Sequence, residues 1–468
     1  MSKEFLFLKS AVSTQVKFMS VEQIRTWAKK WNEKVNVSIE KVTFNQLDKW
    51  ILNREDALRH ESGKFFSIDG ISVSTNWGNR HYWEQPIINQ PEVGYLGFLT
   101  KEFDGVLHFL LQAKIEPGNI NHVQLSPTLQ ATRSNYSQVH KGRKPAYLEY
   151  FQNAKPEAVL LDQLQSEQGG RFLKKRNRNI IIKVEEEIGV KEEFCWVTLR
   201  QLKELMKEDN LVNMDTRTVI SGISYGSYDL KTIDFYEYLI SRSDSNDLPF
   251  LNSFLANVDS YNPLDKIISL ITDRKSKFDL EVRKVPLGII KDWVLSDEKI
   301  YHKDSRFFSV IPVKVTISNR EVSQWCQPMV EPAQSGLCAF VCKKINNVMH
   351  FIVQLKLECG NHDVVELAPT VQCLTGNYRE TGEGKLPFLD EVLRSEPQNR
   401  LVDSLQSEEG GRFYKEENRN MIVHLQDIDL DLPENYMWMT VNQMLTFLRF
   451  NNFLNIQSRS LIASLTLA

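Results

Sequence analysis

The chain is 468 residues long, carries a formal net charge of -3, and is 42% hydrophobic and 25% charged. Because single hydrophobic cores stop growing near about 250 to 300 residues, this length predicts more than one domain of ordinary globular composition. The charge gives no basic surface for nucleic acid, and no apolar run approaches the roughly 20 residues that span a bilayer. We therefore expect a cytoplasmic protein with no nucleic-acid partner and no membrane segment.

The first part of the chain mixes helical and strand patterns. From Val21 to Trp31 the apolar residues recur at helical spacing, which predicts a helix. Alternating or apolar runs predict strands over 66–73, 93–99 and 106–114, and a glycine turn follows at Gly118. A closing helix is expected over 199–208. Short strands with helices at both ends favour an α+β unit over a series of βαβ crossovers.

Two motifs occur twice. Gln124–Tyr136 (QLSPTLQATRSNY) recurs in altered form as Glu366–Tyr378, and Asp162–Phe172 (DQLQSEQGGRF) recurs as Asp403–Phe413. The two copies occupy about 21–223 and 264–465, whereas 224–263 has no counterpart and is expected to contain a loop over 241–247. The repeats predict a tandem duplication, with an N-terminal module over 1–223, a connector over 224–263 and a C-terminal module over 264–468.

The second motif suits binding of a nucleotide diphosphate. Gly169 and Gly170 permit close approach of the backbone to a ligand, and Arg171 offers planar, bidentate donors to phosphate oxygens. Trp83, which recurs as Trp325, offers a face on which a base could stack. The alternatives are that the motif is a turn with a surface ion pair and that the tryptophan belongs to the core.

The differences between the copies indicate which one does chemistry. Arg133, His140 and Lys141 of the first copy correspond to Thr375, Gly382 and a glutamate in the second, which therefore loses cationic and titratable groups. If only one copy is catalytic, we expect it to be the first. The alternative is that 137–145 is only a basic surface loop.

The first motif, together with 147–149, 165–170, 176–179 and the second-copy stretch 365–373, resembles the NDP-hexose 2,3-dehydratase family over nearly the whole chain. The resemblance implies a cofactor-independent lyase acting on dTDP-4-keto-6-deoxy-D-glucose, with no metal and with functional coupling to a 3-ketoreductase. It also implies two tandem modules similar to the Nudix hydrolase fold, in a homodimer. The Nudix signature itself is missing, which disfavours divalent-metal pyrophosphatase chemistry.

In such a reaction a base removes the C3 proton, donors stabilise the enolate, and an acid assists departure of the C2 hydroxyl. The candidates for the catalytic groups are Arg133, Tyr136, His140, Lys141, Tyr147, Glu149 and Glu167. The residues expected to bind substrate are His60, Trp83, Thr128, Gln130, Asn135, Arg143, Ser166, Gly169, Gly170, Arg171, Asn177, Arg178 and Asn179. A second, vestigial or structural nucleotide site is expected from His302, Trp325, Thr370, Gln372, Asn377, Tyr378, Ser407, Gly410, Gly411, Arg412, Asn418 and Arg419.

Two other functions stay open at this point: a nucleotide-sugar pyrophosphatase on a Nudix-like fold, and a binding protein that leaves its nucleotide sugar unchanged. Because cationic groups survive selectively in the first copy, Arg133→Ala and Lys141→Ala should abolish turnover, whereas Arg412→Ala should leave most of it.

Overall fold

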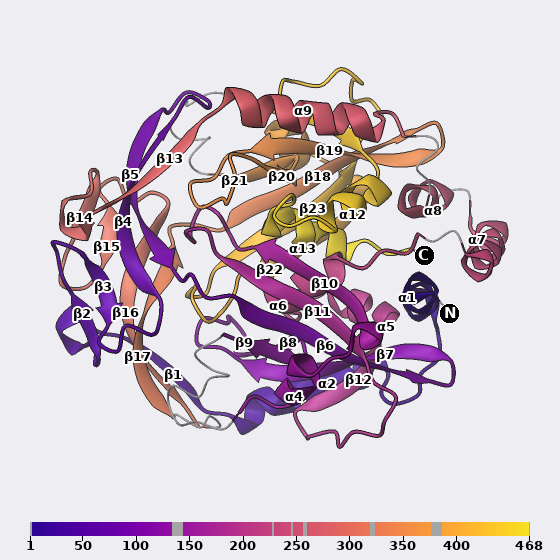
Figure 1. Cartoon of the computed structure of the whole chain (residues 1–468), viewed down its shortest axis with the longest axis horizontal. Coiled ribbons are helices and arrows are strands. Elements are labelled where there is room, and N and C mark those ends of the chain that lie inside the picture. The colour runs from indigo at the N-terminus through magenta and orange to yellow at the C-terminus, as the bar shows by residue number, and fades with distance from the viewer. Residues whose placement is uncertain are drawn as a thin grey trace.

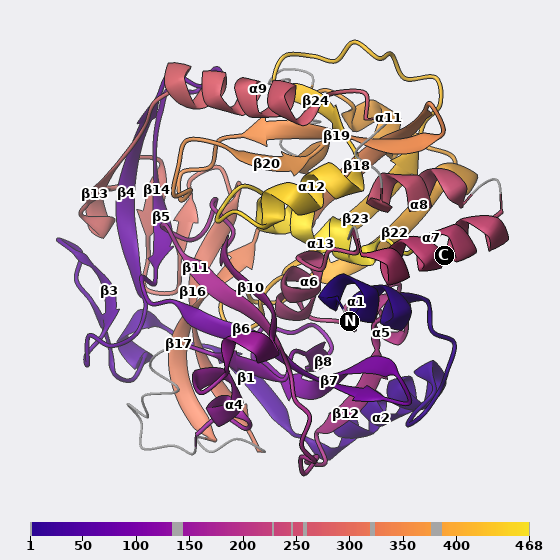
Figure 2. The same cartoon turned by 45° about the vertical axis from the view of Figure 1, so that its right-hand side comes forward.

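The structure, a computed structural model, describes residues 2–132, 144–226, 229–244, 247–255, 260–318, 323–375 and 386–467. These residues form four β-sheets together with helices (Figures 1 and 2). Two sheets have seven strands each and two have five, and the five-stranded sheets lie together at one end of the molecule, on the left of Figure 1. The mixed architecture confirms the predicted α+β class.

The first seven-stranded sheet belongs to the N-terminal module. Its strand order is β10 (Val159–Ser166), β11 (Arg176–Lys183), β6 (Gly94–Phe103), β7 (Val106–Ile115) and β12 (Phe194–Thr198), with β8 (Val123–Ser126) on β7 and β9 (Leu129–Ala131) on β6. Only β11 and β6 run parallel among its described pairs. From Val21 onward the described helices of the module are α2 (Val21–Lys34), α4 (Leu148–Gln152), α5 (Leu199–Leu205) and α6 (Met214–Ser221). The predicted strands and both predicted helices are confirmed to within a few residues.

The second seven-stranded sheet repeats this order. It consists of β22 (Arg400–Ser407), β23 (Glu417–His424), β18 (Gly336–Ile345), β19 (Val348–Lys356) and β24 (Tyr436–Met439), with β20 (Glu366–Pro369) on β19 and β21 (Val371–Leu374) on β18. Its helices are α9 (Leu264–Lys277), α11 (Leu389–Leu393), α12 (Val441–Leu448) and α13 (Ile456–Ser464). Short 3-10 turns also match, at Phe44–Gln46 and Leu287–Ile289, and at Pro156–Ala158 and Pro397–Asn399.

The two five-stranded sheets exchange one strand each. The first holds β2 (Trp50–Leu52), β3 (Ala57–His60), β4 (Ser67–Thr75) and β5 (Tyr82–Asn89), and it gains β13 (Leu280–Val285) from the C-terminal module. The second holds β14 (Trp293–Leu295), β15 (Ile300–His302), β16 (Phe308–Ile317) and β17 (Gln324–Pro332), and it gains β1 (Val37–Lys41). Strand β13 pairs antiparallel with β4, and β1 pairs antiparallel with β16. The modules are therefore interlocked by main-chain hydrogen bonds, which the sequence did not indicate.

The modules also meet through helices α6 and α13, each of which buries an arginine in the other module. Arg217 donates to Ser460 Oγ at 2.8 Å and to the carbonyl oxygen of Ser407, while Arg459 donates to Thr218 Oγ1 at 2.8 Å and to the carbonyl oxygen of Ser166. Burial lowers the pKa of both guanidinium groups to about 10, so both stay charged at neutral pH.

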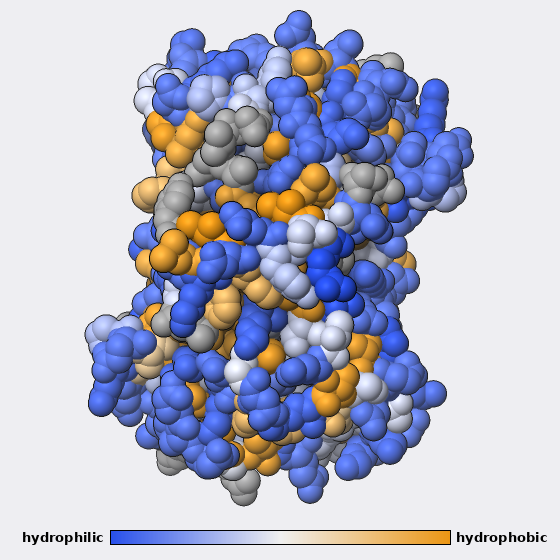
Figure 3. Space-filling model, turned by 90° about the vertical axis from the view of Figure 1, so that its right-hand side faces the viewer, coloured by the Kyte–Doolittle hydropathy of each residue, from blue (hydrophilic) through white to orange (hydrophobic). Residues whose placement is uncertain are grey.

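The first 20 residues, which we call the lead-in, and the connector contain helices that the sequence did not predict. Helix α1 (Lys3–Val12) buries Leu6, Phe7 and Leu8, and the connector forms α7 (Leu230–Arg242) and α8 (Leu248–Leu255). The exposed apolar side chains of α7 include Leu230. In Figure 3, apolar side chains gather over the middle of the face on which α7 and α8 lie. No helix in the described ranges is long and apolar enough to span a membrane.

Candidate active site

Each Gly-Gly-Arg turn docks on the glycine turn of the other module. The amide of Gly118 donates to the carbonyl of Gly410 at 2.7 Å, and the amide of Gly360 donates to the carbonyl of Gly169 at 2.7 Å. A Cβ at Gly118 would lie 1.6 Å from a main-chain oxygen, that of Phe413, so no side chain fits there. The docking creates two composite sites, each made of one module's seven-stranded sheet and the other module's arginine turn.

The arginine of each turn is held over an aromatic ring. The guanidinium of Arg171 lies 4.1 Å from the ring centroid of Phe308, and that of Arg412 lies 4.0 Å from that of Phe66. Each also donates to the carbonyl of the glycine before it. Within the described ranges, the buried Nε of both arginines has no hydrogen-bond partner. A fixed guanidinium with an unpaired buried donor is suited to an anionic ligand.

A tryptophan and a glutamine position each turn from the five-stranded sheets. Trp83 donates from Nε1 to Gln85 at 3.0 Å, and Gln85 donates to the carbonyl of Gly170 at 3.1 Å. Trp325 and Gln327 repeat this relay at 2.8 Å for each bond, ending on the carbonyl of Gly411. The relay fixes the indole edges beside the arginine turns.

Each predicted histidine belongs to the composite site opposite to the one that the sequence assigned to it. A cavity of about 360 Å³ is lined by Trp83 and Arg171 of the first module and by Trp293, His302 and Phe307 of the second. Burial is the main cause that lowers the pKa of His302. His60 instead packs 5.5 Å from Trp50, whose indole donates to the carbonyl of Cys326 in the second module. The structure thus separates His60 from Trp83 and Arg171, with which the sequence grouped it.

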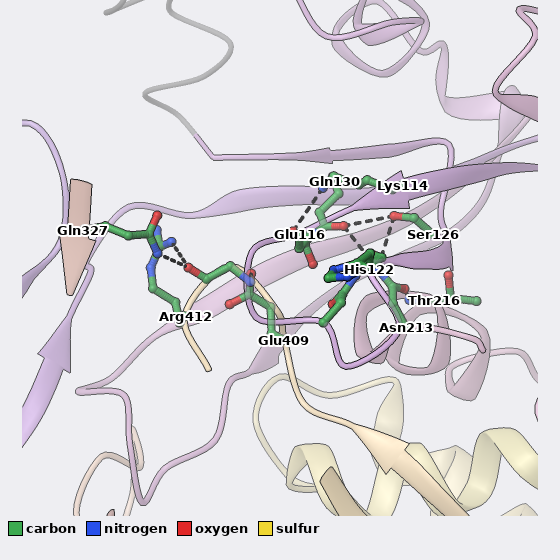
Figure 4. A network of polar contacts seen from close by, with 12 residues as sticks. Lys114, Glu116, His122, Ser126, Gln130, Asn213, Thr216, Gln327, Glu409 and Arg412 are labelled. Carbon is green, nitrogen blue, oxygen red and sulfur yellow. Dashed lines mark hydrogen bonds and ion pairs between the residues drawn. The ribbon is translucent and has the colours of Figure 1, made fainter. Parts of the chain in front are cut away.

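The Arg412 site, as we call the first composite site, contains Lys114, Glu116, His122, Ser126, Gln130 and Asn213 from the first module and Gln327, Glu409 and Arg412 from the second (Figure 4). Gln130 donates to Glu116 at 2.8 Å, and Ser126 donates to Gln130 at 3.0 Å. The Nζ of Lys114 lies 3.4 Å from a carboxylate oxygen of Glu116. The other oxygen of Glu116 is buried without a partner among the residues described.

The Arg171 site is built on the same plan from Lys356, Glu358, Gln372 and Asn455 of the second module and Gln85, Gln168 and Arg171 of the first. Gln372 donates to Glu358 at 3.0 Å, and Asn455 donates to Gln372 at 2.7 Å. Burial raises the pKa of Glu358, against the charges of Lys356 and Arg171. Both composite sites therefore combine a cation with a buried carboxyl group.

Several predicted site residues make hydrogen bonds or ion pairs within the protein that stabilise the fold. Thr128 and Thr370 bind main-chain groups of neighbouring strands. Arg178 and Arg419 form two-bonded ion pairs with Asp162 and Asp403 on the adjacent strands. The remaining structural contacts are those of Tyr147 with Gly189 and Lys191, Asn177 with Glu167, Asn418 with Glu408, Asn179 with Thr218, Ser166 with Glu366 and Ser407 with Gln124.

Of the two glutamates among the catalytic candidates, one is exposed and the other is buried. Glu149 is exposed on α4. Glu167 is buried, and desolvation raises its pKa against the nearby charges of Arg459 and Lys175. Arg133, Asn135, Tyr136, His140, Lys141, Arg143, Asn377 and Tyr378 lie outside the described residues. Their predicted roles, and the roles of the residues above, stay predictions.

The sequence reasoning missed Lys114, Glu116 and Glu409. The signal for the first two was present, because Lys-x-Glu-x-Gly-Asn occurs in both copies, at 114–119 and 356–361. Glu409 corresponds to Gln168, a difference between copies that became meaningful only when both turns were seen to face equivalent carboxyl groups. Arg412 was assigned to a second site within its own module, whereas the structure places it at the sheet of the first module.

Composite sites of this kind, with fixed arginines beside buried carboxyl groups, are typical of enzymes that bind an anionic substrate and transfer protons on it. The family model described as NDP-hexose 2,3-dehydratase matches residues 21–223 and again 264–465. These matches cover most of the chain, and the chain belongs to the NDP-hexose 2,3-dehydratase family.

Three curated proteins, each named dTDP-4-dehydro-6-deoxy-alpha-D-glucopyranose 2,3-dehydratase, are similar to this chain. The protein from Saccharopolyspora spinosa is 41% identical over 98% of this chain and 94% of its own length. The protein from Amycolatopsis orientalis is 39% identical over 98% of this chain and 93% of its own length. The protein from Streptomyces violaceoruber is 40% identical over 91% of this chain and 92% of its own length.

Proposed function

We propose that this chain removes the C2 hydroxyl, as water, from dTDP-4-keto-6-deoxy-D-glucose and gives dTDP-3,4-diketo-2,6-dideoxy-D-glucose. The observation that carries this function is the similarity of about 40%, along nearly the full length, to three proteins named for acting on that sugar. The match of the family model to both modules supports it.

The chemistry follows from the C4 ketone, which acidifies the C3 proton. Removal of that proton gives an enolate, which expels the C2 hydroxyl, and the resulting enol then tautomerises to the diketone. A base, an acid and donors to the enolate oxygen are sufficient because the overall change is loss of water. The sequence nominates Arg133, Asn135 and Lys141 as donors, and the acid and base from among the other candidates of the first copy.

The substrate's diphosphate suits the two arginine turns. Arg171 and Arg412 each hold a guanidinium over a ring with a buried donor unpaired in the described part of the chain. Trp83 and Arg171 line the same cavity of about 360 Å³, which supports a contact between Trp83 and the base. We propose that each arginine turn receives a nucleotide diphosphate, so that the second predicted nucleotide site is also composite.

The function is tested by mass spectrometry of purified protein incubated with dTDP-4-keto-6-deoxy-D-glucose, with a 3-ketoreductase and NADPH to trap the unstable diketone. A reduced product that is one water lighter than the reduced starting sugar, with the missing hydroxyl placed at C2 by NMR, is the expected result. Release of dTMP on addition of magnesium would instead identify a pyrophosphatase. A sugar that is bound and recovered unchanged would identify a binding protein.

Three further parts of this proposal rest on the resemblance, namely the Nudix-like fold of each module, the homodimer and coupling to a 3-ketoreductase, whereas a cytoplasmic location rests on the sequence pattern. The mixed seven-stranded sheets are compatible with the first of these. The exposed apolar residues of α7, which include Leu230, Ile233, Tyr238 and Ile240, are compatible with the second. Light scattering of the purified protein, which gives the mass in solution, tests the dimer directly.

A further inference from the structure

The two composite sites share a common plan, and they differ at His122, Ser126 and Glu409 of the Arg412 site, which correspond to Val364, Ala368 and Gln168. Five positions carry the same residue type in both sites: Lys114 and Lys356, Glu116 and Glu358, Gln130 and Gln372, Asn213 and Asn455, Arg412 and Arg171. The residue that opens the Gly-Gly turn is Glu409 in the Arg412 site and Gln168 in the Arg171 site. A carboxylate can accept a proton from carbon, whereas an amide cannot.

Glu409 is fixed by its own turn. One carboxylate oxygen accepts a hydrogen bond from the amide of Gly411 at 3.0 Å. A Cβ at Gly411 would lie 2.3 Å from that oxygen, so the side chain can fold back onto the amide only because residue 411 is glycine. In Figure 4 the turn brings Glu409 between Arg412, on the same turn, and Glu116, on the sheet of the first module.

The surroundings of Glu409 contain groups that are ready for a ligand. Glu116 is 5% exposed, and one of its oxygens, although buried, has no partner among the residues that the structure describes. The same holds for Nε of Arg412. A buried donor and a buried acceptor, both unpaired and on either side of Glu409, are suited to a ligand that supplies an anionic oxygen and a hydroxyl group.

Burial, together with the charges around Glu409, brings the pKa of its carboxyl group close to neutral pH. Desolvation raises its pKa, and the carboxyl groups of Glu116 and Glu167 add to this effect, while Arg412 and Lys114 oppose it. The resulting pKa is about 7. A general base is most effective when its pKa lies near the working pH, because it is then ionised and still strongly basic.

We propose that Glu409 is the base that removes the C3 proton, so that elimination takes place in the Arg412 site and not in the Arg171 site. This inference rests on the proposed dehydratase function. It moves the central catalytic group into the C-terminal module and makes each module incomplete without the other.

The step balances without an oxidant or reductant. Glu409 takes the proton from C3, and the electron pair of the C3–H bond forms C3=C4 with the negative charge on the C4 oxygen. The C4 carbonyl then re-forms as C2=C3 forms and the C2–O bond breaks, and the departing hydroxide leaves as water after it gains a proton. The resulting enol gains a proton at C2 and loses the proton of its C3 hydroxyl, which gives the diketone.

The test uses the full-length protein with Glu409→Gln, which keeps the size of the side chain and removes its basicity. Turnover is measured with the ketoreductase trap, binding of dTDP is measured by calorimetry, and loss of deuterium from substrate labelled at C3 is measured by mass spectrometry. We expect kcat to fall by about 10²-fold or more, the size of a general-base contribution, with dTDP binding retained and release of deuterium lost. We also expect kcat/KM of the wild type to rise with pH up to about 7 and this rise to be absent from any residual activity of the variant.

Glu408→Gln is the matched control. Glu408 is the neighbouring carboxyl, it is buried, and it accepts from Asn418 at 2.5 Å, outside the set of groups that face the proposed substrate. Its replacement should change kcat by less than about threefold, because it removes no group that contacts the transition state. Glu409→Asp should recover part of the lost turnover, because it restores a carboxylate one methylene away.

Two results would overturn the inference. One is a Glu409→Gln protein that retains kcat within about tenfold of the wild type, which is less than removal of a general base should cost. The other is a variant that no longer forms product yet still releases deuterium from C3, which would place Glu409 at a later step. Failure of the proposed function is distinguishable, because the wild type would then give no trapped product and Glu409 would have no turnover to affect.

Discussion

Replacement of Gly118 by alanine should destabilise the whole protein through the interlock of the modules. The added Cβ would lie 1.6 Å from the main-chain oxygen of Phe413 and 2.8 Å from that of Gly410, and neither backbone atom can yield as a flexible side chain would. The displaced turn would also lose its hydrogen bonds with Gly410 and Lys415, at 2.7 and 2.8 Å. Overpacking costs about 1 to 3 kcal/mol, and the two bonds contribute about 0.5 to 1.5 kcal/mol each.

The sum is a loss of about 2 to 6 kcal/mol in the free energy of unfolding. With an unfolding entropy of about 2 cal/mol/K per residue, a chain of this length that unfolds as one unit loses about 1 °C in Tm per kcal/mol. Calorimetry should therefore record a fall in Tm of about 2 to 6 °C. Gly360→Ala should behave alike, because its Cβ would lie 1.7 Å from the main-chain oxygen of Phe172.

The matched control is Gly189→Ala, since a Cβ at that exposed glycine meets nothing within 4 Å. Its unfolding free energy should stay within about 1 kcal/mol of the wild type. If Gly118→Ala unfolds at the temperature of Gly189→Ala, the turn is not held against the second module as the structure places it, and the reasoning about composite sites fails with it.

Arg412→Ala should lower turnover more than a comparison of the two copies predicts, because Arg412 completes the site that contains Glu116 of the first module. Measurements of kcat and of dTDP binding for this variant and for Arg171→Ala check this prediction. Arg217→Met should lower the urea midpoint by an amount equivalent to about 3 kcal/mol, whereas Arg178→Met, which breaks a surface pair with Asp162, should cost less than about 1 kcal/mol. Burial raises the pKa of Glu408 from 4.5 to about 8 in the folded state. Between these two pKa values the folded state therefore keeps a proton on Glu408 that the unfolded state has lost. Wild-type stability relative to Glu408→Gln should therefore fall as pH rises from about 5 to about 8, as urea unfolding at both pH values can measure. Residues 1–223 expressed alone should not give a folded monomer, because β4 would lose β13 and present an open edge.

Much of the local structure could be predicted because its causes are local. The helix from Val21, the strands over 67–75, 94–103 and 106–115, and the closing helix Leu199–Leu205 follow from apolar periodicity within each segment. The helix of the lead-in was missed, although its buried face (Leu6, Phe7 and Leu8) is apolar, because the stretch is short and has no counterpart in the second copy. The connector helices were missed because the connector also has no counterpart in the other copy, and only the loop over 241–247 was predicted there.

The repeats identified many of the candidate residues, but they could not show which of these residues share one site. A repeat shows which residues are kept and leaves open whether a kept residue faces its own module or the other. His302 lines the cavity beside Trp83 and Arg171, and Trp50, the neighbour of His60, binds the second module, so the groups cross between copies.

The sequence by itself determined that one α+β module occurs twice, where several of its strands and helices lie, and which polar residues both copies retain. Only the tertiary structure decided that the modules exchange β1 and β13 and that each arginine turn completes the other module's site. The physical reason is that hydrogen bonds between strands and the packing of glycine turns depend on which chains meet in space. Periodicity and composition predict which face of a helix or strand is buried, whereas the element that packs against that face depends on the fold of the whole chain.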